Sequence, residues 1–273
     1  KRLILFMKKY EMLPTEENLI ETMYKDTINR NKDIVYFYNI LQAQESASTI
    51  AIDGRWGSGK TFFVCQTKLV INALNPSCDM DEEEKAKVTI RLPFLKNNEE
   101  NENCSIAVYY DAWENDNDTE PVLSLIYEIT KQLSVDFSLS DKSIVKTAGA
   151  IIEAISGHNV NGIMDTLTSE DPFTKFKEQK DVQQKIKDFF TGLLAERGNR
   201  LVIFIDELDR CKPTFAVHLL EQIKHYIFDD RITFVFSVNL EQLQHTIKHY
   251  YGADFDACRY LDRFFDLRIS MPP

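Results

Sequence analysis

Gly54-Arg55-Trp56-Gly57-Ser58-Gly59-Lys60-Thr61 is the stretch that decides the fold, because it fits the pattern G-x-x-x-x-G-K-[ST] at every constrained position. Residues 48–53 before it have the composition of a short strand, and residues 62–74 after it have that of a helix. The eight residues therefore form a turn between a strand and a helix, which is the setting in which this pattern binds phosphate. An ordinary glycine turn would not require all of the matched positions.

The chemistry of this loop follows from its residue types. Glycines permit backbone conformations that a Cβ excludes, so successive N–H groups can turn toward a phosphate, and the helix start adds further N–H donors. We expect Lys60 to reach the β- and γ-phosphates in a catalytic role and the Thr61 hydroxyl to bind Mg²⁺. The predicted nucleotide-binding residues are Gly54, Arg55, Trp56, Gly57, Ser58, Gly59, Lys60, Thr61 and Phe62.

A second motif ends the apolar run 201–205 with Asp206 and Glu207. Such a run predicts a buried parallel strand, and acids at its carboxyl end lie where open α/β sheets bind ligands. Asp206 is predicted to contact Mg²⁺, directly or through a water, and Glu207 to polarise the water that attacks the γ-phosphate. The alternative for Glu207 is a solvated carboxylate at the end of a strand.

Strands alternate with helices along the rest of the chain. Further strands are predicted at 106–110 and 232–238, with another after the segment 260–269, and helices at 15–46, 121–133, 181–196, 214–228 and 240–250. This order predicts right-handed crossovers and a three-layer α/β fold, in which helices cover both faces of a mostly parallel central sheet.

The chain divides into a helical lead-in, residues 1–48, and a nucleotide-binding domain, residues 49–273. Two insertions interrupt the domain: an acidic one at about 75–104, expected to be a loop around 88–95, and a helical one at about 134–180. Within the second, residues 144–164 predict an amphipathic helix or hairpin, because their apolar stretch is far below the roughly 20 residues of a membrane-spanning helix.

Composition and motif content limit the kinds of partner, cellular location and nucleotide that we expect for this chain. The net charge of −11 and the lack of a basic-aromatic cluster argue against nucleic acid as a partner. The five scattered cysteines form no C-x-x-C pair, which predicts a reducing, cytoplasmic location and no structural zinc. The guanine-specifying pattern Asn-Lys-x-Asp is absent, which favours ATP over GTP.

Several further residues have two interpretations each. Asn239 ends the strand 232–238, where it could orient the attacking water or cap the next helix. Arg263 could neutralise charge on the phosphoryl group, from within the chain or from a neighbouring subunit, or form a surface salt bridge. Arg210 is expected to pair locally with an acid or contact a neighbour, and Trp56 to pack under the loop or approach the nucleotide. Trp113 is expected to lie in the core.

These motifs together resemble the KAP P-loop NTPases, across the stretches 50–61, 109–113, 203–211 (Ile-Phe-Ile-Asp-Glu-Leu-Asp-Arg-Cys) and 260–265. The resemblance implies a P-loop NTPase of the additional-strand class, with Asp206 and Glu207 in the metal-binding and water-activating roles. Family members include bacterial proteins tied to plasmid or phage exclusion and neuronal scaffold proteins. Many have transmembrane helices between the two motifs, and the family often has an acid where this chain has Asn239.

Two functions follow as hypotheses. The first is hydrolysis of ATP with Mg²⁺ to drive assembly or activation of a defence or signalling complex. The second is a nucleotide-gated scaffold with little or no turnover. Either function implies a homo-oligomer or an effector protein as partner, and no predicted spanning segment supports membrane association.

Overall fold

The computed structural model describes residues 12–27, 29–78, 80–90, 92, 104–133, 174–226 and 229–271, without the side chains of 174–183. The predicted segment 144–164 and most of the 134–180 insertion lie outside these residues. The described strands form one parallel sheet in the order β2-β3-β4-β1-β5. They are β1 (Ser48–Asp53), β2 (Ser105–Asp111), β3 (Arg200–Asp206), β4 (Ile232–Val238) and β5 (Leu267–Ser270).

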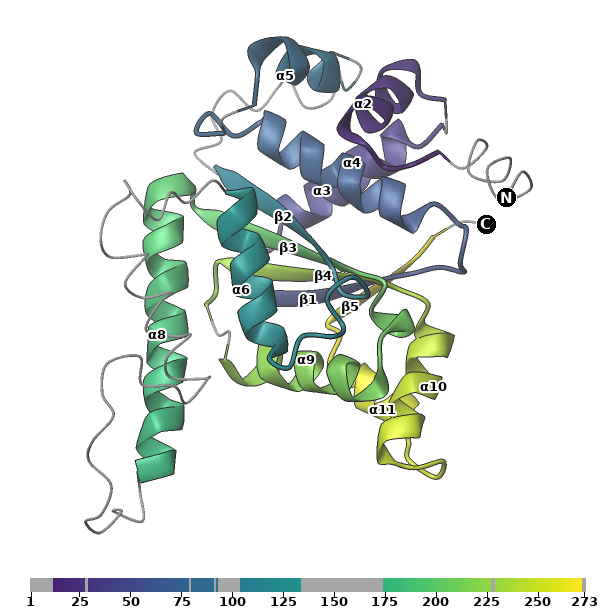
Figure 1. Cartoon of the computed structure of the whole chain (residues 1–273). Helices are drawn as coiled ribbons and strands as arrows, with labels where there is room; N and C mark the ends of the chain where they lie inside the picture. Colours follow the sequence, from purple (N-terminus) through teal and green to yellow (C-terminus); the bar gives the residue numbers. More distant parts are fainter. Residues whose placement is uncertain are drawn as a thin grey trace, which may run out of the picture.

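Helices cover both faces of this sheet (Figure 1). One layer contains α2 (Glu16–Lys25), α3 (Asn31–Gln42), α4 (Lys60–Ala73) and α5 (Glu82–Thr89). The other contains α6 (Pro121–Gln132), α8 (Thr174–Arg197), α9 (Pro213–Tyr226), α10 (Leu240–Tyr251) and α11 (Ala257–Asp262). The predicted three-layer α/β fold is therefore confirmed.

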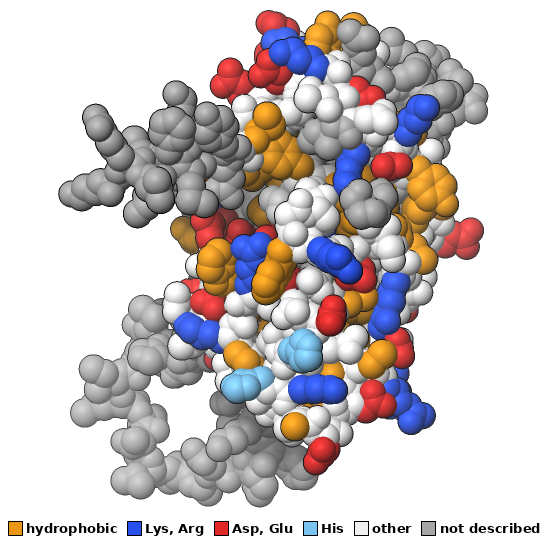
Figure 2. Space-filling view, turned by 90° about the vertical axis from the view of Figure 1, so that its right-hand side faces the viewer, with side chains coloured by type: hydrophobic (Ala, Val, Ile, Leu, Met, Phe, Trp, Pro, Cys, Tyr) orange, Lys and Arg blue, Asp and Glu red, His pale blue; other side chains and the backbone are white. Residues whose placement is uncertain are grey.

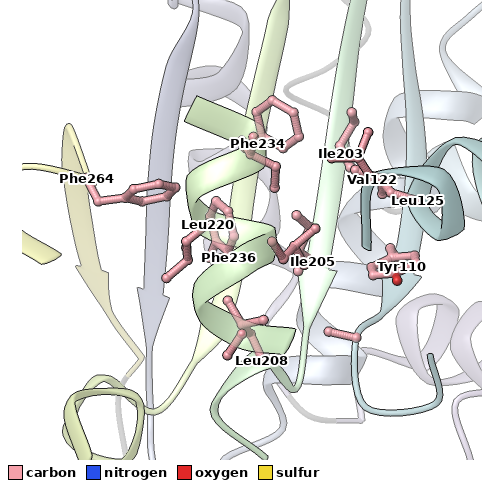
Figure 3. Close-up of a cluster of buried hydrophobic side chains, with 14 of the residues drawn as sticks. Tyr110, Val122, Leu125, Ile203, Ile205, Leu208, Leu220, Phe234, Phe236 and Phe264 are labelled. Carbon is pink, nitrogen blue, oxygen red and sulfur yellow. The ribbon is translucent and has the colours of Figure 1, made fainter. Parts of the chain in front are cut away.

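The side chains of the central strands explain the two layers. Successive residues of a strand point to opposite faces, so Val202 and Phe204 pack under the α4 layer while Ile203 and Ile205 pack under α6 and α9. Figure 3 shows Phe236 beside Leu220 of α9 and Ile203 beside Val122 and Leu125 of α6, all within the apolar cluster on this face of the sheet. Both faces are apolar because both are covered, which is why the strands read as continuous hydrophobic runs.

Three expectations about individual elements need correction. The predicted helix 15–46 is two helices, because Asp26 adopts a left-handed conformation (φ 49°) and ends α2. The acidic segment expected to be a loop contains α5, whose amino end is capped by Asp81 and carries acids that favour the positive end of a helix dipole. The helix predicted at 181–196 begins earlier, at Thr174.

The outer edge of the sheet is protected by side-chain amides. Asn72 of α4 donates to the carbonyl of Ala107 (3.0 Å) and accepts from its N–H (2.8 Å). Gln132 of α6 does the same for Tyr109, accepting from its N–H at 3.0 Å and donating to its carbonyl at 2.5 Å. Because unpaired groups on an edge strand invite pairing with other chains, these amides complete β2 on the side where none of the described strands pairs with it.

None of the described helices combines the length and the apolarity that crossing a bilayer demands. Figure 2 views the molecule from the right-hand side of Figure 1, where β4 leads into α10. Acidic and basic side chains are interspersed over the coloured part of this face, with scattered hydrophobic groups between them. The described surface on this side therefore presents no continuous basic area of the kind that follows a nucleic-acid backbone.

Replacing Asn72 by Leu should lower the free energy of unfolding by about 1–3 kcal/mol, because the N–H and carbonyl of buried Ala107 lose their partners. Urea denaturation measures this change. The matched control is Gln184→Leu, which removes an exposed helix amide that bonds the side chain of Asp188. Equal stability of the two variants would show that the amide pair does not support the edge.

Candidate functional site

The pairing of the strands brings the ends of β1, β3 and β4 side by side. Asp53, the last residue of β1, is in register with Val238 at the end of β4. Asp206, the last residue of β3, is in register with Ser237 of β4. Because the strands are parallel, the segments that follow them leave the same edge of the sheet, which is where open α/β sheets bind ligands.

The loop after β1 has a backbone suited to anions. Gly57 and Gly59 have φ values of 79° and 80°, a left-handed conformation that side chains with a Cβ disfavour. Gly59 is the N-cap of α4 and provides no side-chain acceptor for the first N–H groups of the helix. A Cβ on Gly54 would lie 2.8 Å from Ser58 Oγ. The loop can thus offer backbone donors, and the helix dipole, to a phosphate.

Two cationic side chains contact the carbonyls of this loop. Lys60 is buried, and its Nζ donates to the carbonyls of Gly54 (2.7 Å) and Arg55 (3.2 Å). Arg30, before α3, donates from Nη2 to the carbonyl of Ser58 at 3.1 Å. Lys60 is therefore held at the loop that we expect it to serve, and Arg30 connects that loop to the lead-in helices.

Thr61, in the first turn of α4, contacts Asp206, at the carboxyl end of β3. Thr61 Oγ1 donates to Asp206 Oδ2 at 2.6 Å, and the hydroxyl of Tyr109 donates to the same oxygen at 3.1 Å. The other carboxylate oxygen accepts from the N–H of Glu207 at 3.0 Å. Asp206 is fully buried. The structure thus brings together both residues predicted to bind metal.

This pair fits Mg²⁺ by its chemistry. Mg²⁺ prefers oxygen donors and commonly takes one or two protein ligands together with phosphate oxygens, which suits one hydroxyl and one carboxylate. Among the described residues, no group of three or more His, Cys, Asp or Glu side chains could hold a metal by itself. The described residues therefore do not form a metal site made of such side chains alone.

Glu207 lies beside Asp206 in an unusual conformation. Its φ is 60°, and its Oε2 lies 2.5 Å from Nε of Arg210. Burial raises the pKa of Glu207 to about 7; the Asp206 carboxylate adds to the rise and the Arg210 guanidinium opposes it. A carboxylate with a pKa near neutrality is a stronger base than an ordinary one, which suits proton abstraction from water.

Both tryptophans lie outside the core, contrary to expectation. Trp56 is 54% exposed and Trp113 is 52% exposed. Trp56 Nε1 donates to Asp209 Oδ2 at 2.8 Å, and Arg210 lies over both indole rings. A hydrogen-bond acceptor for the indole N–H and a cation for the rings make this exposed position stable.

The predictions for Asn239 and Arg263 have different outcomes. Asn239 follows β4 and caps α10, since its side chain accepts from the N–H of Gln242 at 3.3 Å. Its predicted role at the water stays a prediction. Arg263 lies next to Phe264, whose carbonyl accepts from Thr49 at the start of β1. That is the amino end of the strands, opposite the phosphate loop, so the chain does not bring its own Arg263 to this site.

The structure adds two residues that the sequence analysis did not assign to the site. Tyr109 contacts Asp206 from β2, and Asp209 contacts Trp56 from the short helix η2 (Leu208–Arg210). Tyr109 could not be chosen over Tyr110 without the strand register, because only one of the two points toward β3's last carboxylate. Asp209 was visible in the sequence as the third acid of the motif, three residues after Asp206.

Comparison with known proteins agrees with this geometry. The family model described as the KAP family P-loop domain matches residues 30–273, which include the loop, both acids and β5. An uncharacterized protein of Methanocaldococcus jannaschii is 37% identical over 68 residues, which are 25% of this chain and 34% of that protein. The match thus spans about a third of that relative's length.

The raised pKa of Glu207 predicts a pH-dependent stability. Its folded pKa of about 7 lies above its ordinary 4.5, so this residue stabilises the fold below pH 4.5 and the contribution is lost as pH rises through 7. The difference in unfolding free energy between wild type and Glu207→Gln should fall by about 1–3 kcal/mol from pH 5 to 8. Denaturation in metal-free buffer measures it, and a flat or rising difference would contradict the assignment.

Proposed function

The chain belongs to the KAP family of P-loop domains, and we propose on that premise that it binds ATP with Mg²⁺ and hydrolyses it. The observation that carries the proposal is the 2.6 Å contact between Thr61 and Asp206, which unites the two motifs at the phosphate loop. A short sequence motif could occur by chance, but a hydroxyl and a buried carboxylate that meet beside a helix N-terminus are the oxygen donors that a magnesium–phosphate site requires.

Different residues of the site bind the phosphates and the metal ion. The N–H groups at the start of α4 face the phosphates, and the ammonium of Lys60, which now bonds two loop carbonyls, transfers its hydrogen bonds to phosphate oxygens. Thr61 and Asp206 would hold Mg²⁺, which when bound would supply positive charge against the phosphates.

Glu207 acts on the attacking water. It accepts a proton from the water while the water oxygen bonds to the γ-phosphorus, and the bond from that phosphorus to the β-phosphate oxygen breaks. The products are ADP and inorganic phosphate. The position of Glu207, one residue beyond the metal ligand and with a pKa raised to about 7, supports this role.

A nucleotide-gated scaffold is the second candidate, and one contact favours it. Glu207 is ion-paired with Arg210, whose guanidinium engages one of the two carboxylate oxygens and makes the carboxylate a weaker base. A chain that keeps this pair would bind ATP and turn it over slowly, presenting a surface to a partner. The two candidate functions thus differ in whether the Glu207 carboxylate stays paired with Arg210 or is released to act on the water.

The biological output is inferred from family membership. We propose that nucleotide binding drives assembly or activation of a defence or signalling complex, with a homo-oligomer or an effector protein as partner. A location in the reducing cytoplasm is supported by the five unpaired cysteines, Cys65, Cys78, Cys104, Cys211 and Cys258.

Lys60→Ala should weaken ATP binding at least about tenfold, because a charge-assisted contact to phosphate is lost. Titration calorimetry with Mg²⁺ and a nonhydrolysable ATP analogue measures the affinity. Lys68→Ala is the matched control, since Lys68 lies on the same helix but bonds Gln132 instead of the loop. Equal losses in the two variants would place the nucleotide elsewhere.

Glu207→Gln separates the two candidate functions. If the chain is an ATPase, the variant should keep ATP affinity and lose about 10²–10⁴ in kcat, the usual contribution of a general base. Phosphate release under single-turnover conditions measures the rate. If the chain is a scaffold, wild type should hydrolyse no faster than this variant, and Lys60→Ala, rather than Glu207→Gln, should abolish binding to the partner.

A further inference from the structure

Arg210 is held between two indole rings from separate loops. Its guanidinium carbon lies 5.6 Å from the ring centroid of Trp56, in the phosphate loop, and 5.5 Å from that of Trp113, which follows β2. These are the only tryptophans of the chain. Because a guanidinium is attracted to the face of an indole, the two rings restrict where this side chain can go. We call Trp56, Arg210 and Trp113 the tryptophan clamp.

The clamp places Arg210 against Glu207. Nε of Arg210 lies 2.5 Å from Oε2 of Glu207, and the N–H of Arg210 donates to the Glu207 carbonyl at 3.0 Å. Glu207 itself has a φ of 60°, which is uncommon for a residue with a Cβ and persists only where neighbouring contacts enforce it. One oxygen of the carboxylate that would accept the water's proton is therefore engaged by a cation.

We propose that Arg210 is a positioning residue that restrains Glu207, and that hydrolysis requires the Arg210–Glu207 pair to separate. The proposal rests on the function proposed above, in which Glu207 activates the water. Arg210 is then the group that limits the rate, and the two indole rings hold it in place. Arg210 acts through Glu207 and is not itself assigned a contact with the substrate.

The phosphate loop has a direct connection to the clamp. Trp56 belongs to that loop, and its Nε1 donates at 2.8 Å to Asp209, the residue before Arg210. Asp209 is buried and its Oδ1 has no hydrogen-bond partner among the described residues, so the bond from Trp56 is important for keeping this carboxylate in place. A change in the shape of the loop therefore moves a ring of the clamp and the anchor beside Arg210.

Trp113 allows a test that leaves the phosphate loop intact. Its side chain is half exposed, and its N–H, which donates to Asp111 at 3.0 Å, remains in any variant. Trp113→Ala should raise kcat about two- to fivefold with KM unchanged, the ratio that corresponds to one exposed cation–π contact. Trp113→Phe retains an aromatic face and should behave as wild type. An unchanged or lower kcat in folded Trp113→Ala overturns the proposal.

Fluorescence gives a second readout that needs no turnover. In a Trp56→Phe variant, Trp113 is the only tryptophan, and its quenching by acrylamide reports how well Arg210 covers its ring. Adding Mg²⁺ and a nonhydrolysable ATP analogue should increase the quenching, because Arg210 leaves the ring when the pair with Glu207 separates. Quenching that stays constant overturns the proposal when calorimetry shows the analogue bound. Failure of the analogue to bind would reject the proposed function, and this proposal with it.

Discussion

The contact between Thr61 and Asp206 joins residues 145 positions apart in the chain, and the rest of the site is arranged around it. It exists because β4 lies between β1 and β3 and keeps the ends of all three strands level. Asp206 is fully buried, a position that a carboxylate tolerates only with hydrogen-bond donors around it. Donors come from α4, from β2 and from its own chain neighbour. The site thus depends on the order of the strands.

Protection of the sheet edge and construction of the site are linked through β2. Gln132 bonds both backbone groups of Tyr109, while the hydroxyl of the same tyrosine donates to Asp206. Fixing the edge of the strand therefore also fixes a donor to the buried carboxylate. Burial and the nearby Asp206 charge raise the pKa of Tyr109, so the phenol keeps the proton that it donates. Through this tyrosine, α6 influences the end of β3 that carries Asp206.

The sequence was informative where a residue's role is set by its neighbours in the chain. The phosphate loop and the buried strand before Asp206 have local signatures, so the fold class could be predicted. The positions of Trp56 and Trp113 could not, because an exposed indole depends on an acceptor and a cation from another loop. Arg263 failed as an in-chain candidate for a similar reason: only the pairing of β5 with β1 shows which end of the sheet it occupies. Asp26 shows the same limit, since its left-handed conformation divided a pattern that was helical throughout.

The groups assigned to ATP already have partners within the protein, and this affects how tightly a nucleotide can bind. Lys60 bonds two loop carbonyls, Thr61 bonds Asp206, and Glu207 bonds Arg210. A polyphosphate with its metal must replace at least the first two sets, so its affinity is the difference between new and existing bonds rather than the sum of new contacts. In our proposal nucleotide binding also separates the third pair, and the stronger that pair is, the smaller the fraction of nucleotide-bound protein in which Glu207 is released from the guanidinium. Affinity and turnover can therefore vary separately, so the same residues would suit a fast ATPase or a slow nucleotide-dependent scaffold according to the strength of one ion pair.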